Sequence, residues 1–169
     1  MPKLIKDRQI IDDNFSLLKL NEDGSLPAIP ADGDVIVPLT AWLVQKDALL
    51  ARNGKTGVWI DSHEEVEMLG SDAGKFALVA INFPAFTDGR GFSTARLLRE
   101  RYGYQGELRA IGDVFKDLLF YMQRCGFNAF AVRADKDIDE ALKGLNDFSE
   151  AYQVAVDRPV PLFRRRNAA

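Results

Sequence analysis

The chain has 169 residues, the length of one average domain, and a chain of this size buries roughly 70% of its unfolded surface on folding without needing a disulfide or a metal. Its net charge is −3 and its one basic run, Arg164–Arg166, lies at the C-terminal end, so nucleic acid is a poor candidate partner. A single cysteine, Cys125, and a single histidine, His63, exclude an internal disulfide, a cysteine-ligated iron–sulfur cluster and a multi-histidine zinc site.

The chain carries no signal of a membrane protein or a secreted protein. No apolar stretch approaches the ~18 residues that a spanning helix requires, and the N-terminal residues lack the apolar core of a signal peptide. We therefore expect one cytoplasmic domain, residues 1–169, that binds no metal, no nucleic acid and no membrane. A redox reaction on such a chain needs an organic cofactor or a partner protein, and the sequence leaves the cofactor unknown.

The first thirty residues contain apolar pairs separated by turn-forming residues. The run from Asn21 to Ser25 has turn chemistry and lies between two candidate edge strands. We expect residues 1–30 to form a peripheral N-terminal hairpin.

From Val35 onward, short apolar runs alternate with segments of helical period, which is the pattern of βαβ units and a parallel sheet. The expected strands are Val35–Val37, Gly57–Asp61, Phe76–Phe83, Glu107–Ile111 and Ala129–Arg133. The expected helices cover residues 40–52, 63–69, 94–102, 114–125 and 137–152. The fold class is therefore α/β with a mainly parallel sheet, and five units fit either an open flavodoxin-like or Rossmann-like sheet or a partial β/α barrel.

Capping residues mark the helix boundaries. The expected N-caps are Thr40, Ser62 with Glu65, Ser93 and Asp113. The glycines expected to end helices are Gly54, Gly70, Gly103 and Gly126.

Cys125 belongs to an apolar stripe of the helix at 114–125, so we expect a buried, unreactive thiol. Residues 157–169 are expected to form an extended tail that docks on the domain or on a partner through Leu162 and Phe163.

The segment from Asn82 to Ser93 is the most informative for function, because it leads from the carboxyl end of an apolar strand into a helix. Two glycines let the backbone approach a ligand, and arginines add positive charge near the helix amides. Together they suit a small oxyanion or a phosphate. The candidate substrate- or anion-binding residues are Asp88, Gly89, Arg90, Gly91, Ser93, Arg96, Arg109 and Asp113.

The same segment also has an alternative interpretation, in which its residues have only structural roles. Asp88-Gly89 is then a turn, Ser93 an ordinary N-cap, and Arg96 one half of a solvated pair with Glu100. The spacing of Gly89 and Gly91 also resembles part of a dinucleotide fingerprint, but the third glycine is missing, so a nucleotide cofactor is weakly indicated.

Arg109 lies in a strand that would be apolar on both faces in the centre of a parallel sheet, so it needs a partner. It either forms a salt bridge, to Asp88 or Asp113, or lies in an edge strand, or lines the same crevice as Arg90 as a second cation. Asp113 is favoured as an N-cap over a catalytic acid.

Several runs resemble one bacterial family. They are residues 83–93, 95–99, 103–104, 106–110, 112–114 and 124–127. This pattern resembles the domain-of-unknown-function family 934, whose label is that of an oxidoreductase of sulfite reduction. The shared residues map here onto Asp88, Gly89, Arg90, Gly91, Ser93, Arg96, Arg109, Gly112 and Asp113.

The resemblance implies a role in assimilatory sulfate or sulfite reduction. One hypothesis is an enzyme or redox subunit that binds a sulfur oxyanion or a nucleotide-linked sulfate at residues 88–93. The other is a non-catalytic subunit that docks on sulfite reductase, or on another sulfate-assimilation enzyme, through that loop or through the tail at Leu162–Arg166. No catalytic residue is implied by the resemblance.

Overall fold

One sheet organises the computed structural model, which describes residues 2–166. Within these residues the sheet has eight strands in the order β2-β1-β8-β7-β6-β5-β4-β3. The strands are β1 (Lys3–Lys6), β2 (Gln9–Asp12), β3 (Ser16–Leu17), β4 (Val35–Pro38), β5 (Thr56–Ile60), β6 (Leu78–Phe83), β7 (Glu107–Gly112) and β8 (Ala129–Phe130). Strands β3 to β8 are parallel, whereas β1 pairs antiparallel with both β8 and β2.

Strand order decides between the two arrangements that the sequence leaves open. From β3 to β8 each strand lies beside its neighbour in the chain, whereas a doubly wound sheet of the flavodoxin or Rossmann type reverses its order at a switch point. No such reversal occurs here, and the sheet curls as half of a β/α barrel. The α/β class with a mostly parallel sheet is thus confirmed, and its form is the partial barrel.

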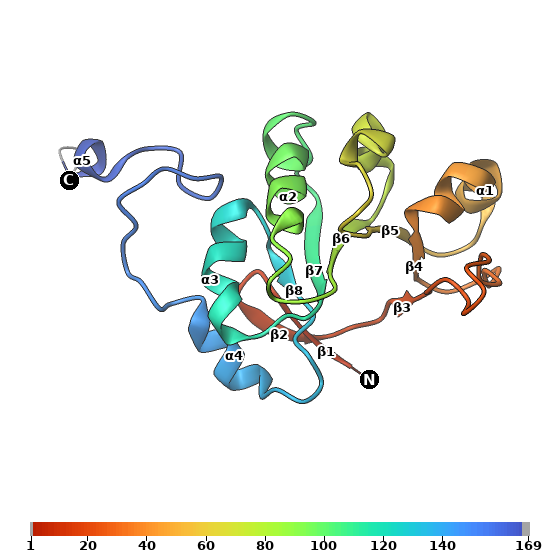
Figure 1. Ribbon diagram of the computed structural model, residues 1–169, viewed down its shortest axis with the longest axis horizontal. Coiled ribbons are helices and arrows are strands. Elements are labelled where there is room, and N and C mark those ends of the chain that lie inside the picture. The colour runs from red at the N-terminus through yellow and green to blue at the C-terminus, as the bar shows by residue number, and fades with distance from the viewer. Residues whose placement is uncertain (1, 167–169) are drawn as a thin grey trace.

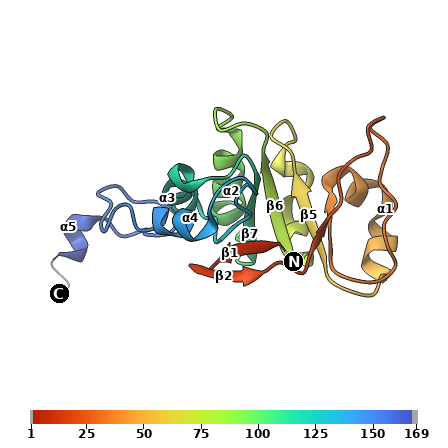
Figure 2. The same ribbon diagram turned by 90° about the horizontal axis from the view of Figure 1, so that it is seen from below.

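The described residues also form five α-helices and two short 3₁₀ segments, of which α4 and α5 follow the last strand. The helices are α1 (Leu39–Ala51), α2 (Arg90–Glu100), α3 (Lys116–Cys125), α4 (Ile138–Gly144) and α5 (Leu162–Arg165). Figures 1 and 2 show α1, α2 and α3 along the same side of the strands. The helix expected at 63–69 is replaced by 3₁₀ segments at Val66–Met68 and Gly70–Lys75, and the helix expected at 137–152 already ends at Gly144.

The expected N-caps are wrong because the helices begin elsewhere than the cap residues predict. The N-caps of α1, α2 and α3 are Pro38, Gly89 and Phe115. β4 runs directly into α1, which places Thr40 inside the helix, and the carboxylate of Asp113 is engaged by other loops instead. Of the glycines expected to end helices, Gly126 is confirmed as the left-handed C-cap of α3. α1 and α2 end earlier, with C-caps at Arg52 and Arg101, so Gly54 and Gly103 lie two residues beyond them, although both have left-handed backbones.

The two faces of the sheet have different cores. Alternate residues of the central strands face the helices and build the main apolar cluster, which includes Val58, Val79, Ile81, Leu108 and Ala110. The residues between them point to the opposite, inner face, where a smaller cluster contains Ile36, Leu78, Ala80 and Ile111.

The N-terminal hairpin exists, but its turn is not at Asn21–Ser25. β1 and β2 form it through a two-residue turn at Asp7-Arg8, both with left-handed backbone angles. Arg8 donates to Oε1 of Gln123 at 2.8 Å, and this distant contact helps to hold a conformation that arginine rarely adopts. The hairpin is also not peripheral, because β1 pairs with β8 and Ile5 is fully buried.

Residues 13–18, here called the strap, cross the inner face from one edge of the sheet to the other. They connect β2 at one edge with β3, which pairs with β4 at the opposite edge. Phe15 packs on the smaller apolar cluster, and Nε1 of Trp59 donates to the carbonyl oxygen of Leu18 at 2.8 Å. The strap therefore covers the face that a full barrel would enclose.

The C-terminal arm, residues 145–166, leaves α4 and extends away from the sheet past α3 (Figure 1). It is fastened by Arg124, whose Nη1 lies 2.6 Å from Oδ1 of Asp157. The tail is not extended throughout, because Leu162–Arg165 forms the short helix α5. Among the described residues, no helix has the length and apolarity needed to cross a membrane.

Candidate functional site

The carboxyl ends of β5, β6, β7 and β8 meet at one edge of the sheet, which is where ligands bind in parallel α/β folds. The loops that follow these strands carry a set of polar side chains, here called the rim. Its members are Asp61, Ser62, Asn82, Asp88, Arg90, Asp113 and Arg133. Six of the eight predicted site residues lie in the loops of this rim or in the first turn of α2: Asp88, Gly89, Arg90, Gly91, Ser93 and Asp113.

Asp88 and Arg90 form a two-point ion pair at the N-terminal end of α2. Nε of Arg90 lies 2.9 Å from Oδ1 of Asp88, and Nη2 lies 2.7 Å from Oδ2. The backbone amide of Arg90 also donates to Oδ1, at 3.2 Å. The guanidinium holds the pKa of the Asp88 carboxyl well below its usual range. A carboxylate therefore occupies the place at the helix N-terminus where the sequence predicts an oxyanion.

The guanidinium of Arg90 remains open to solvent despite this pair. Its side chain is 62% exposed, and its remaining hydrogen bond is to Oγ of Ser62, at 3.1 Å, in the loop after β5. Arg90 thus connects two loops of the rim and presents one face outward. Ser93 is also exposed, inside the first turn of α2.

The two glycines of the loop differ in role. Gly89 is exposed, and a Cβ there would meet only Phe92, at an ordinary 3.8 Å. Gly91 is buried, and a Cβ there would lie 2.7 Å from the ring of Phe83 on β6. The absence of a side chain at Gly91 therefore lets α2 pack closely on the sheet, which is a structural need and not a ligand contact.

Asp113 ties three loops together. Its Oδ2 accepts from the backbone amide of Phe86 at 2.8 Å, and its Oδ1 accepts from Nη1 of Arg133 at 2.7 Å. Its own amide donates to the carbonyl oxygen of Phe83. The carboxylate thereby fixes the β6–α2 loop against the segment after β8. Arg133 was expected inside a strand, but β8 ends at Phe130, which frees Arg133 to reach the rim.

Asp61 and Asn82 form a further pair that the sequence analysis did not select. Nδ2 of Asn82 donates to Oδ1 of Asp61 at 3.0 Å, and Nδ1 of His63 lies 3.5 Å from Oδ2. The sequence did contain a signal for this pair, because each of the two polar residues lies at the end of an otherwise apolar strand. His63 itself is largely exposed.

Arg96 does not join the rim residues in a shared contact. Its Nε lies 2.9 Å from Oε2 of Glu100, one turn further along α2, and its side chain is exposed. This is the solvated pair of the structural interpretation.

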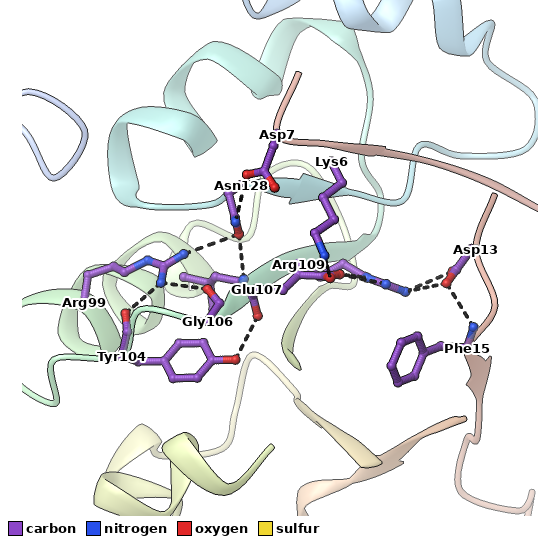
Figure 3. Close-up of polar contacts among 11 residues, drawn as sticks. Lys6, Asp7, Asp13, Phe15, Arg99, Tyr104, Gly106, Glu107, Arg109 and Asn128 are labelled. Atoms are coloured by element: carbon purple, nitrogen blue, oxygen red, sulfur yellow. Dashed lines mark hydrogen bonds and ion pairs between the residues drawn. The ribbon is translucent and has the colours of Figure 1, made fainter. Parts of the chain in front are cut away.

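Arg109 lies on β7, and Figure 3 shows it with the residues that it contacts. It points to the inner face, where its guanidinium lies 2.7 Å from Glu107 and 2.9 Å from Asp13 of the strap. Nζ of Lys6 completes this cluster at 2.8 Å from Glu107, and the ring of Phe15 lies beneath the guanidinium. Its partners are therefore neither Asp88 nor Asp113, and the cluster fastens the N-terminal region to β7.

A half-buried arginine, Arg99, organises the connection between α2 and β7 (Figure 3). Its guanidinium donates to the carbonyl oxygens of Tyr104, Gly106 and Gly126 at 2.7 to 2.9 Å. Burial lowers the pKa of Arg99. Arg99 therefore satisfies carbonyl groups of the α2–β7 loop and of the C-terminal end of α3.

These features define an α/β half-barrel with a charged rim at the carboxyl ends of its parallel strands. The chain belongs to the family described as a bacterial protein of unknown function (DUF934), whose profile matches residues 57–163. No curated protein and no solved structure matches the chain significantly. The matched region begins in β5 and ends in α5, so it contains the entire rim, whereas β1 to β4 and the strap lie outside it.

Proposed function

We propose that the chain acts in the cytoplasm in assimilatory sulfate or sulfite reduction, as an oxidoreductase or as an accessory subunit. Its ligand in this proposal is a sulfur oxyanion or a nucleotide-linked sulfate, bound at the β6–α2 loop. The pathway follows from the family resemblance of residues 83–127, and the ligand class follows from the chemistry of the loop.

The observation that carries the ligand class is the Asp88–Arg90 pair. Both carboxylate oxygens of Asp88 already accept hydrogen bonds from the guanidinium of Arg90, and one of them also accepts from the first backbone amide of α2. Because the Arg90 side chain is 62% exposed, an external dianion can reach its guanidinium and compete with the Asp88 carboxylate for it. Sulfate and sulfite have the charge and the oxygen spacing that Arg90 binds in this way.

Calorimetric titration with sulfite, sulfate, adenylyl sulfate, NADPH and flavin tests the proposal. We expect saturable binding of a sulfur oxyanion, lost in Arg90→Ala and strengthened several-fold in Asp88→Asn, which removes the competing carboxylate. The matched control is Arg101→Ala, because Arg101 is an exposed arginine at the other end of α2, paired with Glu67. Absence of binding, or equal binding by Arg90→Ala, contradicts the oxyanion site.

A second candidate is a non-catalytic subunit that docks on sulfite reductase or on another sulfate-assimilation enzyme. It is favoured by the exposure of large apolar side chains on the C-terminal arm: Phe148 is 64% exposed, Tyr152 74% and Phe163 56%. Co-purification with the reductase tests it. We expect the full chain to be retained and a chain ending at Arg158, which lacks Phe163, to be retained less. Equal retention of the two chains would exclude the tail as the contact.

A further inference from the structure

A cavity of about 410 Å³ lies between α2, α3 and residues 151–156 of the C-terminal arm. Its volume is within the range of small-molecule sites, and none of the rim residues lines it. On the two helices, the polar groups in its wall come from Arg96, Tyr121, Arg124 and Cys125, and the arm adds Tyr152 and Gln153. The cavity therefore brings a cation, a phenol and the only thiol of the chain together at a place that the proposed function does not use.

Arg96 is the cation that remains available to a ligand. Its Nε is held by Glu100, but within residues 2–166 neither of its terminal nitrogens makes a hydrogen bond. Arg124 is different, because Nη1 is bound to Asp157 and Nη2 to the carbonyl oxygen of Gln153. Arg124 therefore holds the arm in place, whereas Arg96 can receive an anion from the cavity.

The phenol and the thiol of the cavity are neutral near pH 7. The neighbouring Cys125 raises the pKa of the Tyr121 hydroxyl. Burial raises the pKa of the Cys125 thiol. Neither group therefore brings a negative charge that would oppose an anion beside Arg96. The carboxylates that face the cavity's arginines are those of Glu100 and Asp157, each already paired.

The remaining wall is apolar and partly aromatic. Phe120, Val154 and Val156 line it, and the ring of Tyr121 is 58% exposed. A ligand with a flat apolar body would bury these surfaces while its charged end reached Arg96.

We propose that this cavity binds a small organic anion with a flat apolar body, whose sulfonate, sulfate or carboxylate group is held by the terminal nitrogens of Arg96. The site is distinct from the β6–α2 loop, so the proposal stands whether or not the chain binds a sulfur oxyanion there.

The single cysteine makes the cavity directly testable in the full-length chain. The probe is anilinonaphthalene sulfonate, which joins a sulfonate to a flat aromatic body and becomes fluorescent in apolar surroundings. We expect one saturable site per chain. Because Cys125 lines the cavity, saturating probe should slow its alkylation by N-ethylmaleimide by about tenfold.

Two variants test whether the sulfonate group of the probe binds to Arg96. Arg96→Gln should weaken probe binding by about fivefold to tenfold, since it removes one charge-assisted hydrogen bond. Arg101→Gln, on the same helix and paired with Glu67 outside the cavity, should leave it unchanged. Circular dichroism checks that both variants are folded.

Unchanged probe affinity in a folded Arg96→Gln protein overturns the proposal. So does an alkylation rate of Cys125 that saturating probe leaves unaltered, and this second measurement needs no variant. Loss of oxyanion binding in Arg90→Ala affects neither result, so failure of the proposed function and failure of this inference can be told apart.

Discussion

Arg109 on β7 and Asp13 on the strap are joined across the inner face of the half-barrel, with Nη1 of Arg109 2.9 Å from Oδ2 of Asp13. The two residues are 96 positions apart in the chain, and the arginine side chain is only 3% exposed. Glu107 occupies the other side of the guanidinium. The strap is thus held on the sheet by a buried, charge-balanced cluster as well as by the packing of Phe15.

Removal of Arg109 should destabilise the fold strongly. Arg109→Ala leaves the carboxylates of Asp13 and Glu107 facing each other in a buried place, and loss of one partner from such a cluster costs about 3 to 5 kcal/mol. Asp13→Asn keeps one acceptor and should cost about 1 to 2 kcal/mol. Urea denaturation of each variant measures the free energy of unfolding. A loss below about 1 kcal/mol in Arg109→Ala would show that the cluster does not hold the strap.

Gly91→Ala should destabilise the protein by about 1 to 3 kcal/mol, because the new Cβ meets the ring of Phe83 at 2.7 Å inside a packed core. Gly89→Ala is the matched control, since its Cβ meets only an ordinary contact, and its stability should stay within about 0.5 kcal/mol. Thermal unfolding of both variants provides the comparison. Equal effects at the two positions would contradict the packing role of Gly91.

Asp157→Ala should loosen the C-terminal arm. Arg124 is 8% exposed and loses the carboxylate that faces its Nη1, which costs about 1 to 3 kcal/mol. Glu150→Ala serves as the control, because Glu150 pairs with Arg158 and Arg165 on the surface of the same arm. Denaturation gives the stability, and proteolysis gives the exposure of residues 145–166. Identical behaviour of both variants would argue against Arg124 as the anchor.

The ion pairs of Asp72 predict a pH dependence. Hydrogen bonds from Lys46 and Lys75 lower the pKa of Asp72 from 3.8 to about 2. The folded state therefore favours the ionised carboxylate, so its contribution is present above about pH 4 and is lost as the pH falls from about 4 towards about 2. Because these side chains are partly exposed, the contribution is at most about 1 kcal/mol.

Comparison of Asp72→Asn with the natural chain measures this contribution. The variant should be less stable at about pH 7, and the difference should shrink as the pH falls below about 4 and approach zero towards about pH 2. Asp47→Asn is the control, because Asp47 is exposed and forms no ion pair within residues 2–166. A difference that stays constant across this pH range would contradict the assignment of the pKa.

The sequence predicted the parts of this protein that depend on neighbouring residues. Four of the five expected βα units were recognisable because strands such as β6 are continuous apolar runs and because α3 repeats its apolar residues every three or four positions. The second unit has 3₁₀ segments in place of its expected helix. Gly126 was recognisable for the same reason, since a helix end with a left-handed residue is a local need.

Contacts between residues far apart in the chain could not be predicted from the sequence. Nothing near Arg109 in the chain indicates that its partner is Asp13, and Asp113 looks like an N-cap until Arg133 and Phe86 are placed beside it. Strand order could not be predicted either, because each βα unit is locally compatible with either an open sheet or a curled one.

The strap also constrains the order in which the protein assembles. β1 needs β8 as its neighbour, and β3 needs β4, so residues 3–17 complete their pairing only after residues 129–130 are available. During synthesis these first residues leave the ribosome long before their partner strand exists. The hairpin and the strap therefore dock late, onto a row of parallel strands that has already formed, and the resulting long-range contacts should make this docking the slow phase of folding.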